Sequence, residues 1–333
     1  MKTKIIAEVG VNHNGSVLLA KKFILAAKKI GIKIIKFQFY TAEKLIMPNT
    51  PMAAYQKKNY KNKKTLDQFK MLKKFELSLS EHIQLSKFCK INGLEYCCSL
   101  FHEDDVKYVN RLGLKRIKIP SGEINNFFLL KKVAKLNKNL ILSTGMSTDD
   151  EVSKAIRFLI INGQSKKKIV VLHCCSSYPT LVPDLNLNMI GYIKNRYKVS
   201  VGFSDHSENI ETPMMAVLKG AELIEKHVTL SKKMKGPDHK VSLNIKEFKR
   251  MISLVKDAED AMGLSKKKVT SSEKKNIFYV RKSLVSKKNI NKGEKFTLKN
   301  LTAKRPVSGI SVGKLEYILG KKAKKNYKKN EII

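Results

Sequence analysis

The 333-residue sequence is 42% hydrophobic and 29% charged, which excludes an intrinsically disordered chain. Its formal net charge of +39 comes from 67 basic residues, of which seven are arginines, and they are spread along the whole chain. Nucleic-acid recognition relies on arginine forks and local basic patches, so a solvated lysine-rich surface is favoured and no nucleic-acid partner is expected. No run of about 18 apolar residues predicts a transmembrane helix, and the start MKTKIIAEVGVNHNG is too polar for a signal peptide. We therefore expect a cytoplasmic protein with no membrane partner.

Short β-rich runs alternate with longer amphipathic segments over residues 1–265. The expected strands cover residues 5–10, 33–39, 95–101, 115–120, 140–145, 168–174, 198–204 and 222–228. Apolar residues recur at helical spacing between them, as in residues 17–31, 80–93, 151–163 and 245–263. Strand followed by helix, eight times, predicts an α/β fold in which parallel strands close into a (β/α)₈ TIM barrel.

Three segments fall outside this alternation. Residues 41–80 form an unusually long loop after the second strand, and such loops open onto the C-terminal face of a barrel, where substrates bind. Residues 266–280 have the composition of a polar linker. In residues 281–333 short apolar runs alternate with Gly, Asn and Lys, which indicates a small β-rich domain. A domain of this size is too small to be strongly stable unless it docks on something.

Polar residues recur at alternate positions near the C-terminal ends of most of the expected strands. They are Glu8, Lys36, Gln38, Lys118, Ser121, Glu123, His173, Ser204, His206, Glu225 and His227. A single polar residue in an apolar strand is ordinarily a satisfied core group, because burying an unpaired charge is expensive. So many of them at one end of a barrel indicate a catalytic mouth, and therefore an enzyme.

The residue types suggest how this mouth works. His206 and His227 lie on neighbouring strands, and two imidazoles with open positions suit Mn²⁺, or another divalent ion such as Mg²⁺ or Co²⁺, acting as a Lewis acid. The alternative is that these histidines hold carboxylates and no metal.

Two lysines, Lys36 and Lys118, come from facing parts of the barrel. With the hydroxyls of Ser121 and Ser204 they would form a cradle for phosphate and carboxylate groups, although a Schiff-base lysine is a competing role. The glutamates Glu8 and Glu123 are candidates for proton transfer.

These residues lie within segments that closely resemble the sialic acid synthase family, the phosphoenolpyruvate-dependent synthases of nonulosonic acids. The matching segments are IAEVGVNHNGS, KFQ, KIPSGEINN, LILSTGMS, LHC followed by SYPT, GFSDH, IEKHVTL and GPDHK. The tail segments RKSLVSKKNINKGE and TAKRPVSGIS resemble the C-terminal antifreeze-like (SAF) domain of that family. The resemblance covers essentially the whole chain.

The resemblance implies a reaction and a role for each residue. Family members join C3 of phosphoenolpyruvate to the aldehyde of an open-chain N-acetylmannosamine-type sugar, water attacks C2, and phosphate leaves by cleavage of its C–O bond. His206 and His227 would bind the metal, while Glu8 and Glu123 would handle protons or the attacking water. Phosphoenolpyruvate would be held by Lys36, Ser99, Lys118, Ser121, Ser176 and Ser204. The sugar would be contacted by Gln38, Tyr178, Glu225, Asp238 and Arg305.

The resemblance also implies a domain-swapped homodimer, in which the SAF domain of one subunit covers the barrel mouth of the other. Arg305 would then reach the N-acetyl group of a sugar bound in the partner. Two departures concern substrate geometry: CSLF (98–101) stands where the family usually has STPF, and Ser176 stands where asparagine or threonine is usual. Ser99 keeps a hydroxyl, and the metal and lysine positions are intact.

The identity of the sugar is the most open question. The leading reading is an N-acetylneuraminate-type synthase, and the alternative is an N,N'-diacetyllegionaminate synthase acting on 2,4-diacetamido-2,4,6-trideoxymannose. These sugars differ at C4 and C6, which would meet the 41–80 loop and the partner's SAF domain. A synthase for a phosphorylated sugar would need more arginines near the mouth. A basic polyanion-binding protein on an inactive barrel would not need Glu8, His206 and His227.

Overall fold

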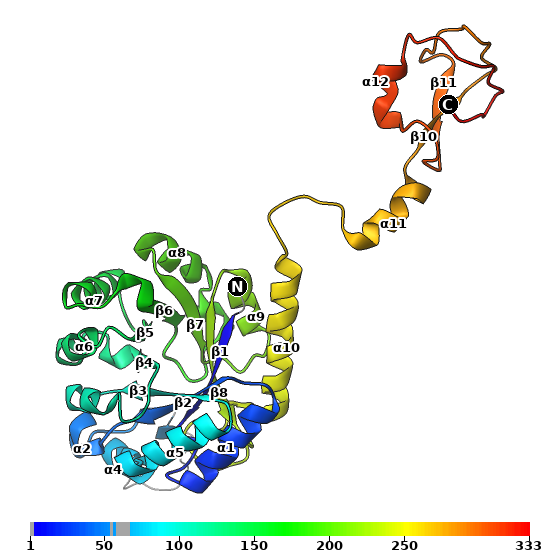
Figure 1. The fold of residues 1–333 in the computed structure, drawn as a ribbon. Coiled ribbons are helices and arrows are strands. Elements are labelled where there is room, and N and C mark those ends of the chain that lie inside the picture. The colour runs from blue at the N-terminus through cyan, green and yellow to red at the C-terminus, as the bar shows by residue number, and fades with distance from the viewer. Residues whose placement is uncertain (1–2, 54–55, 58–66) are drawn as a thin grey trace. The chain divides into compact units, whose positions relative to one another are not determined.

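The computed structural model describes residues 3–53, 56–57 and 67–333 (Figure 1). The chain divides into two compact units, Met1–Gly263 and Leu264–Ile333. Part of the 41–80 loop, residues 54–55 and 58–66, lies outside the described residues. Within the described part, no helix combines the length and apolar character needed to cross a bilayer.

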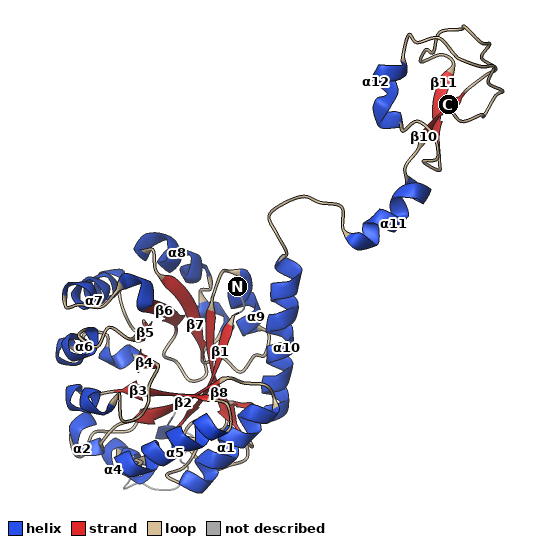
Figure 2. Cartoon of the chain, viewed as in Figure 1, coloured by secondary structure: helices blue, strands red, loops and turns tan. Residues whose placement is uncertain are grey.

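The first unit is a closed barrel of eight parallel strands, as the sequence predicts (Figure 2). The strands are β1 (Lys4–Gly10), β2 (Ile34–Phe39), β3 (Glu95–Leu100), β4 (Arg116–Ile119), β5 (Asn139–Ser143), β6 (Ile169–Cys174), β7 (Ser200–Asp205) and β8 (Leu223–Thr229). Each pairs with the next, and β1 also pairs with β8, which closes the ring. A two-residue strand, β9 (Leu243–Asn244), pairs parallel with the end of β8.

Helices surround this ring of strands, and local sequence signals set their starts. The helices are α1 (Val17–Lys29), α2 (Ala42–Leu45), α4 (Gln68–Phe75), α5 (Leu79–Ile91), α6 (Phe127–Ala134), α7 (Asp149–Ile161), α8 (Asn188–Tyr197), α9 (Thr212–Leu218) and α10 (Ile245–Met262). Ser78, Thr148 and Asn244 each cap a helix in a reciprocal capping box with a glutamate three residues later. Such caps satisfy the free N–H groups of the first turn.

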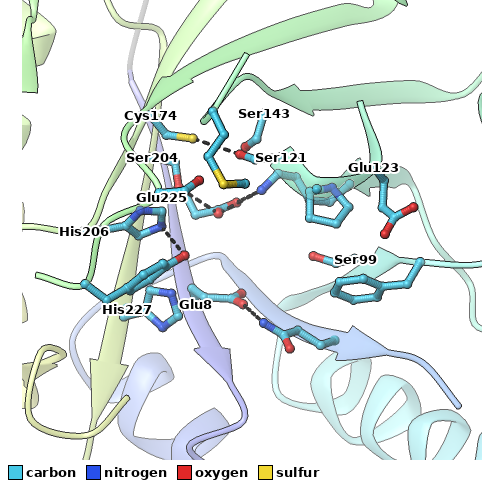
Figure 3. A pocket seen from close by; sticks show the side chains of 18 of the residues that line it. Glu8, Ser99, Ser121, Glu123, Ser143, Cys174, Ser204, His206, Glu225 and His227 are labelled. Carbon is cyan, nitrogen blue, oxygen red and sulfur yellow. Dashed lines mark hydrogen bonds and ion pairs between the residues drawn. The ribbon is translucent and has the colours of Figure 1, made fainter. Parts of the chain in front are cut away.

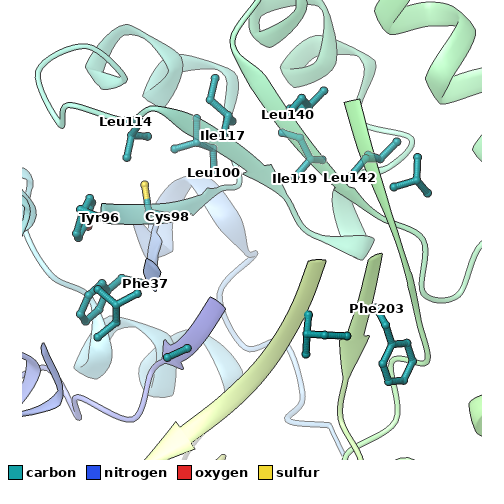
Figure 4. Packing of buried hydrophobic residues seen from close by; sticks show 14 of the residues in the cluster. Phe37, Tyr96, Cys98, Leu100, Leu114, Ile117, Ile119, Leu140, Leu142 and Phe203 are labelled. Carbon is teal, nitrogen blue, oxygen red and sulfur yellow. The ribbon is translucent and has the colours of Figure 1, made fainter. Parts of the chain in front are cut away.

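Two apolar layers hold the barrel together. The larger one lies between the strands and the helices and includes Phe37, Tyr96, Ile119 and Phe203 (Figure 4). The smaller one fills the barrel interior, with one side chain from each of six strands: Ile6, Ile34, Cys97, Ile141, Leu172 and Leu223. At the same level β7 has Gly202, where an added Cβ would lie 2.4 Å from the carbonyl oxygen of Leu223. This interior layer is the floor on which the site is built.

The second unit, Leu264–Ile333, begins with residues expected to be a linker, and ten of them form helix α11 (Ser271–Val280). Thr270 and Glu273 form a capping box at the start of this helix, which polar composition alone did not predict. Beyond it, β10 (Ser283–Ser286) pairs antiparallel with β11 (Leu301–Lys304), and α12 (Leu315–Ile318) follows. Six buried side chains form its core: Leu284, Ile290, Phe296, Leu301, Ile318 and Ala323.

Candidate active site

The site is built by the two-residue period of the strands on top of the interior layer. Side chains at alternate positions of a strand point to the same face. Two places beyond the floor residues of seven strands lie Glu8, Lys36, Ser99, Ser143, Cys174, Ser204 and Glu225, and together with Lys118 of β4 they line one cavity of about 520 Å³ (Figure 3). We call these eight residues the lower tier. Two places further on, Gln38, Phe101, Pro120, Ser176, His206 and His227 line the same cavity as an upper tier.

Two lysines and two glutamates of the lower tier form a connected network. Lys36 Nζ lies 2.8 Å from Glu8 Oε2 and 3.6 Å from Glu225 Oε1. Lys118 Nζ donates to both oxygens of Glu225, at 3.0 and 3.2 Å. Hydroxyls complete it, since Lys36 donates to Ser99 Oγ and Ser204 Oγ donates to Glu225. Every one of the four charged side chains is at most 5% exposed, so they depend on one another for compensation.

The network separates its two carboxyl groups electrostatically. Burial alone would raise the pKa of Glu225, but Lys118 and Lys36 outweigh burial and lower that pKa to about 2. Burial raises the pKa of Glu8, against the opposing charge of Lys36 and with the support of Glu225. Glu225 is therefore a fixed negative charge, whereas Glu8 is the carboxyl group prepared to exchange a proton.

Glu225, a predicted sugar contact, lines the cavity, and its carboxylate accepts hydrogen bonds from Lys118 and Ser204, so its contact with the sugar stays a prediction. In this position it orients the two lysines. His173 was expected at the mouth, yet its Nε2 bonds to the carbonyl oxygen of Leu185 and its ring packs on Phe203. It follows Leu172 by one position rather than two, so the strand period directs it out of the barrel interior.

His206 and His227 form a pair of neutral imidazoles in the upper tier. His206 Nδ1 lies 2.7 Å from the carbonyl oxygen of Cys175, which can only accept, so the proton is on Nδ1 and Nε2 carries a lone pair. Burial lowers the pKa of His206 to about 4, and burial together with His206 lowers the pKa of His227 far below its usual range. The two ring centroids are 5.7 Å apart.

These two histidines are the residues that could hold a divalent metal ion. His227 Nδ1 is buried and has no hydrogen-bond partner among the described residues, while Tyr178 Oη lies 3.1 Å from His206 Nε2. The carbonyl of Cys175 fixes the tautomer of His206, as outer partners of metal-binding histidines commonly do. Among the described residues no group of three or more His, Cys, Asp or Glu is placed to hold a metal ion.

Hydroxyl groups and a second carboxyl group line the side of β4 and β5. Ser121 Oγ accepts from the backbone N–H of Gly145 and lies 3.1 Å from Cys174 Sγ. Glu123, on the same short 3-10 turn, accepts from Asn126, and burial raises its pKa. Ser143 was missed in the sequence, although it follows Ile141 by the same two-residue step that defines the lower tier.

The expected sugar contacts are only partly brought together. Gln38 Nε2 lies 3.5 Å from Glu8 Oε1, and Tyr178 lines the cavity. Asp238 is buried, and burial followed by the charge of Glu8 raises its pKa to about 7, but it does not itself line the cavity. Arg305 belongs to the second unit and is exposed there.

Comparison with known proteins identifies the family. The NeuB family model matches residues 23–267, and the SAF domain model matches residues 281–333. The chain belongs to the NeuB family. It is 46% identical to the N,N'-diacetyllegionaminic acid synthase of Campylobacter jejuni, over all of this chain and 99% of that protein. It is 37% identical to the synthase of the same name from Legionella pneumophila, over 97% of this chain and 90% of that one.

A solved structure of similar fold is consistent with this family. The N-acetylneuraminic acid synthetase of Leptospira borgpetersenii is 29% identical, with a TM-score of 0.71 over 83% of this chain and 90% of that chain. The NeuB family membership therefore rests on the sequence over the full length and on the fold over most of it.

We expect Glu225→Gln to destabilise this NeuB barrel by about 3–5 kcal/mol, because it leaves two buried lysines with one carboxylate. Glu222→Gln is the matched control: Glu222 pairs with Lys194 at 2.9 Å, but both side chains are a third or more exposed, so we expect a loss below about 1 kcal/mol. Denaturant unfolding measures both. Equal losses would contradict the account of the network.

We expect Asp238→Asn to change how stability depends on pH. The pKa of Asp238 is raised from 3.8 to about 7, so between these values the unfolded chain has lost a proton that the folded chain keeps. The wild type should therefore lose stability as pH rises from about 4 to 7, by up to about 4 kcal/mol. Subtracting the unfolding free energies of the two proteins at each pH isolates this effect, and a constant difference would refute it.

Proposed function

We propose that this protein condenses phosphoenolpyruvate with 2,4-diacetamido-2,4,6-trideoxymannose to give N,N'-diacetyllegionaminic acid and phosphate. The observation that carries the proposal is the stacking of two tiers in one cavity, with buried lysines and hydroxyls below and a pair of neutral histidines above. The choice of sugar follows the 46% identical relative, which is named for this product and matches the whole chain. The prediction of an N-acetylneuraminate-type synthase, which was favoured from the sequence, is less well supported by this similarity.

Phosphoenolpyruvate binds in the lower tier in this proposal. Its phosphate and carboxylate groups need cations and hydrogen-bond donors, and Lys36 and Lys118 supply the cations. The hydroxyls are those of Ser99, Ser121, Ser176 and Ser204, which line the same cavity. Glu225 keeps the two ammonium groups in place before the substrate arrives. This pre-organisation favours a direct ionic role for the lysines over a Schiff base.

The sugar aldehyde lies in the upper tier, next to His206 and His227. These two residues would hold Mn²⁺ or a similar divalent ion, which when bound polarises the aldehyde oxygen as a Lewis acid. Gln38 and Tyr178, which line the same cavity, orient the open-chain sugar.

The reaction forms a bond between C3 of phosphoenolpyruvate and C1 of the sugar. Water adds to C2, and the aldehyde oxygen gains a proton. The bond between C2 and the bridging oxygen of the phosphate group then breaks, so phosphate leaves with the bridging oxygen. Glu8 lies between Lys36 and Gln38 and has a raised pKa, so it suits transfer of a proton at the reacting carbons. Glu123 lies at the rim and suits activation of the water.

The second unit completes the site in trans in our proposal. A domain with a core of six buried side chains gains stability by docking on a larger surface. In a domain-swapped homodimer the SAF unit of one subunit would cover the mouth of the other, and Arg305 would bind the N-acetyl group by its planar fork, which lysine cannot reproduce. The protein would act in the cytoplasm.

A phosphate-release assay tests this function. The full chain is incubated with phosphoenolpyruvate, Mn²⁺ and either the trideoxy sugar or N-acetylmannosamine. We expect phosphate release with both partners present, a higher kcat/KM for the trideoxy sugar, and loss of activity on chelation that Mn²⁺ restores. His227→Ala should not be restored by Mn²⁺.

Two results would contradict the proposal in different ways. The absence of phosphate with either sugar would reject the synthase reaction, and faster turnover of N-acetylmannosamine would return the protein to the neuraminate branch.

A further inference from the structure

One side of the cavity differs chemically from the rest. Leu45 and Ile46, at the end of α2, and Leu72, on α4, line it together with Phe101, which follows β3. All four are half-buried, so each has a face directed away from the protein core. We call these four residues the apolar wall. Phe101 belongs to the upper tier, two residues beyond Ser99 of the lower tier.

The apolar wall is held in place from behind. Val11, Tyr40, Met52, Met71 and Phe75 form a buried cluster, against which Leu45, Leu72 and Phe101 pack. The ring of Phe101 meets Tyr40 edge-on, with centroids 5.9 Å apart.

Polar contacts also join α2 to α4 outside the cavity. Lys73 Nζ lies 2.9 Å from Glu43, and the backbone N–H of Ala42 donates to Glu76 at 2.8 Å. The wall is therefore a surface formed before substrate binds rather than a loose loop that collapses on it.

We propose that the apolar wall binds the C6 methyl group of the sugar and thereby selects 6-deoxy sugars over their 6-hydroxy counterparts. This inference rests on the proposed function, which places the aldehyde at His206 and His227 and so directs C4 to C6 toward the rest of the cavity. Among the six chain carbons of this sugar, C6 is the one that bears neither oxygen nor nitrogen. Gln56 and Gln68 line the cavity from the same chain segment and offer amides to the neighbouring acetamido group.

Physical chemistry sets the size of the selection. A methyl group gains from burial against apolar side chains. A hydroxyl in the same place exchanges hydrogen bonds to water for contacts with carbon, which disfavours it. Apolar sites reject an added hydroxyl by roughly 10²-fold at most, so we expect a 10- to 100-fold preference for the 6-deoxy sugar rather than complete exclusion.

The test compares two sugars that differ by one oxygen atom: 2,4-diacetamido-2,4,6-trideoxymannose and 2,4-diacetamido-2,4-dideoxymannose. For the full chain with Mn²⁺ and phosphoenolpyruvate, the ratio of their kcat/KM values is measured. We expect wild type to favour the trideoxy sugar, and Leu72→Asn and Ile46→Asn each to lower the ratio about 10-fold. Met47→Asn is the control, because Met47 follows in the same segment but is 77% exposed and does not line the cavity.

The outcomes separate this inference from the proposed function. If wild type turns over both sugars at equal kcat/KM, or if both asparagine variants keep the wild-type ratio, the apolar wall does not select and the inference is wrong while the synthase stands. If wild type turns over neither sugar, the proposed function fails and the inference fails with it. A binding measurement with phosphoenolpyruvate alone checks that each variant is folded, because the lower tier is untouched.

Discussion

Two lysines and two carboxylates buried in one layer of the barrel are the constraint on which the site depends. Charges with so little exposure are tolerated only when each is compensated, so Lys36, Lys118, Glu8 and Glu225 fix one another's positions. The apolar interior layer below supports them and excludes water. Both lysines lower the pKa of Glu225, whereas burial raises the pKa of Glu8 against its ion pair with Lys36. An anionic substrate entering this layer would meet ammonium groups already in position.

The chemistry of the cavity changes from one level to the next, because side chains two residues apart on a strand point into the cavity at successive levels. One step up, His206 and His227 replace lysines and glutamates, so a region of fixed charge gives way to neutral nitrogen ligands. To one side, the long segment after β2 brings an apolar surface anchored on Phe75 and Met71. An anionic substrate next to a sugar that has a carbonyl end and an apolar end matches this succession.

Much of this was accessible from the sequence, because alternation and periodicity are local properties. All eight strands were predicted, and a step of two residues from the interior apolar residues of six strands reaches six members of the lower tier, including the missed Ser143. Side-chain pairing across the barrel could not be predicted, because it joins residues far apart in the sequence. Glu225 on β8, for example, binds Lys118 on β4, four strands away in the ring. The prediction that His173 lies at the mouth was wrong, because His173 follows the interior residue Leu172 by one position and its side chain therefore points out of the barrel. The apolar wall depends on how α2 packs against α4, and the periodicity of the sequence does not predict this packing.

The most direct measurement of the account is calorimetric titration of phosphoenolpyruvate into the full chain with Mn²⁺ and no sugar. Charge-assisted hydrogen bonds of this kind contribute about 1.5–3 kcal/mol each, so Lys118→Met should weaken binding by about 10- to 100-fold. Lys194→Met, which removes a half-exposed lysine outside the cavity, should leave the affinity unchanged. If Lys118→Met binds phosphoenolpyruvate as tightly as wild type does, the lower tier is not the phosphoenolpyruvate site and the account is wrong.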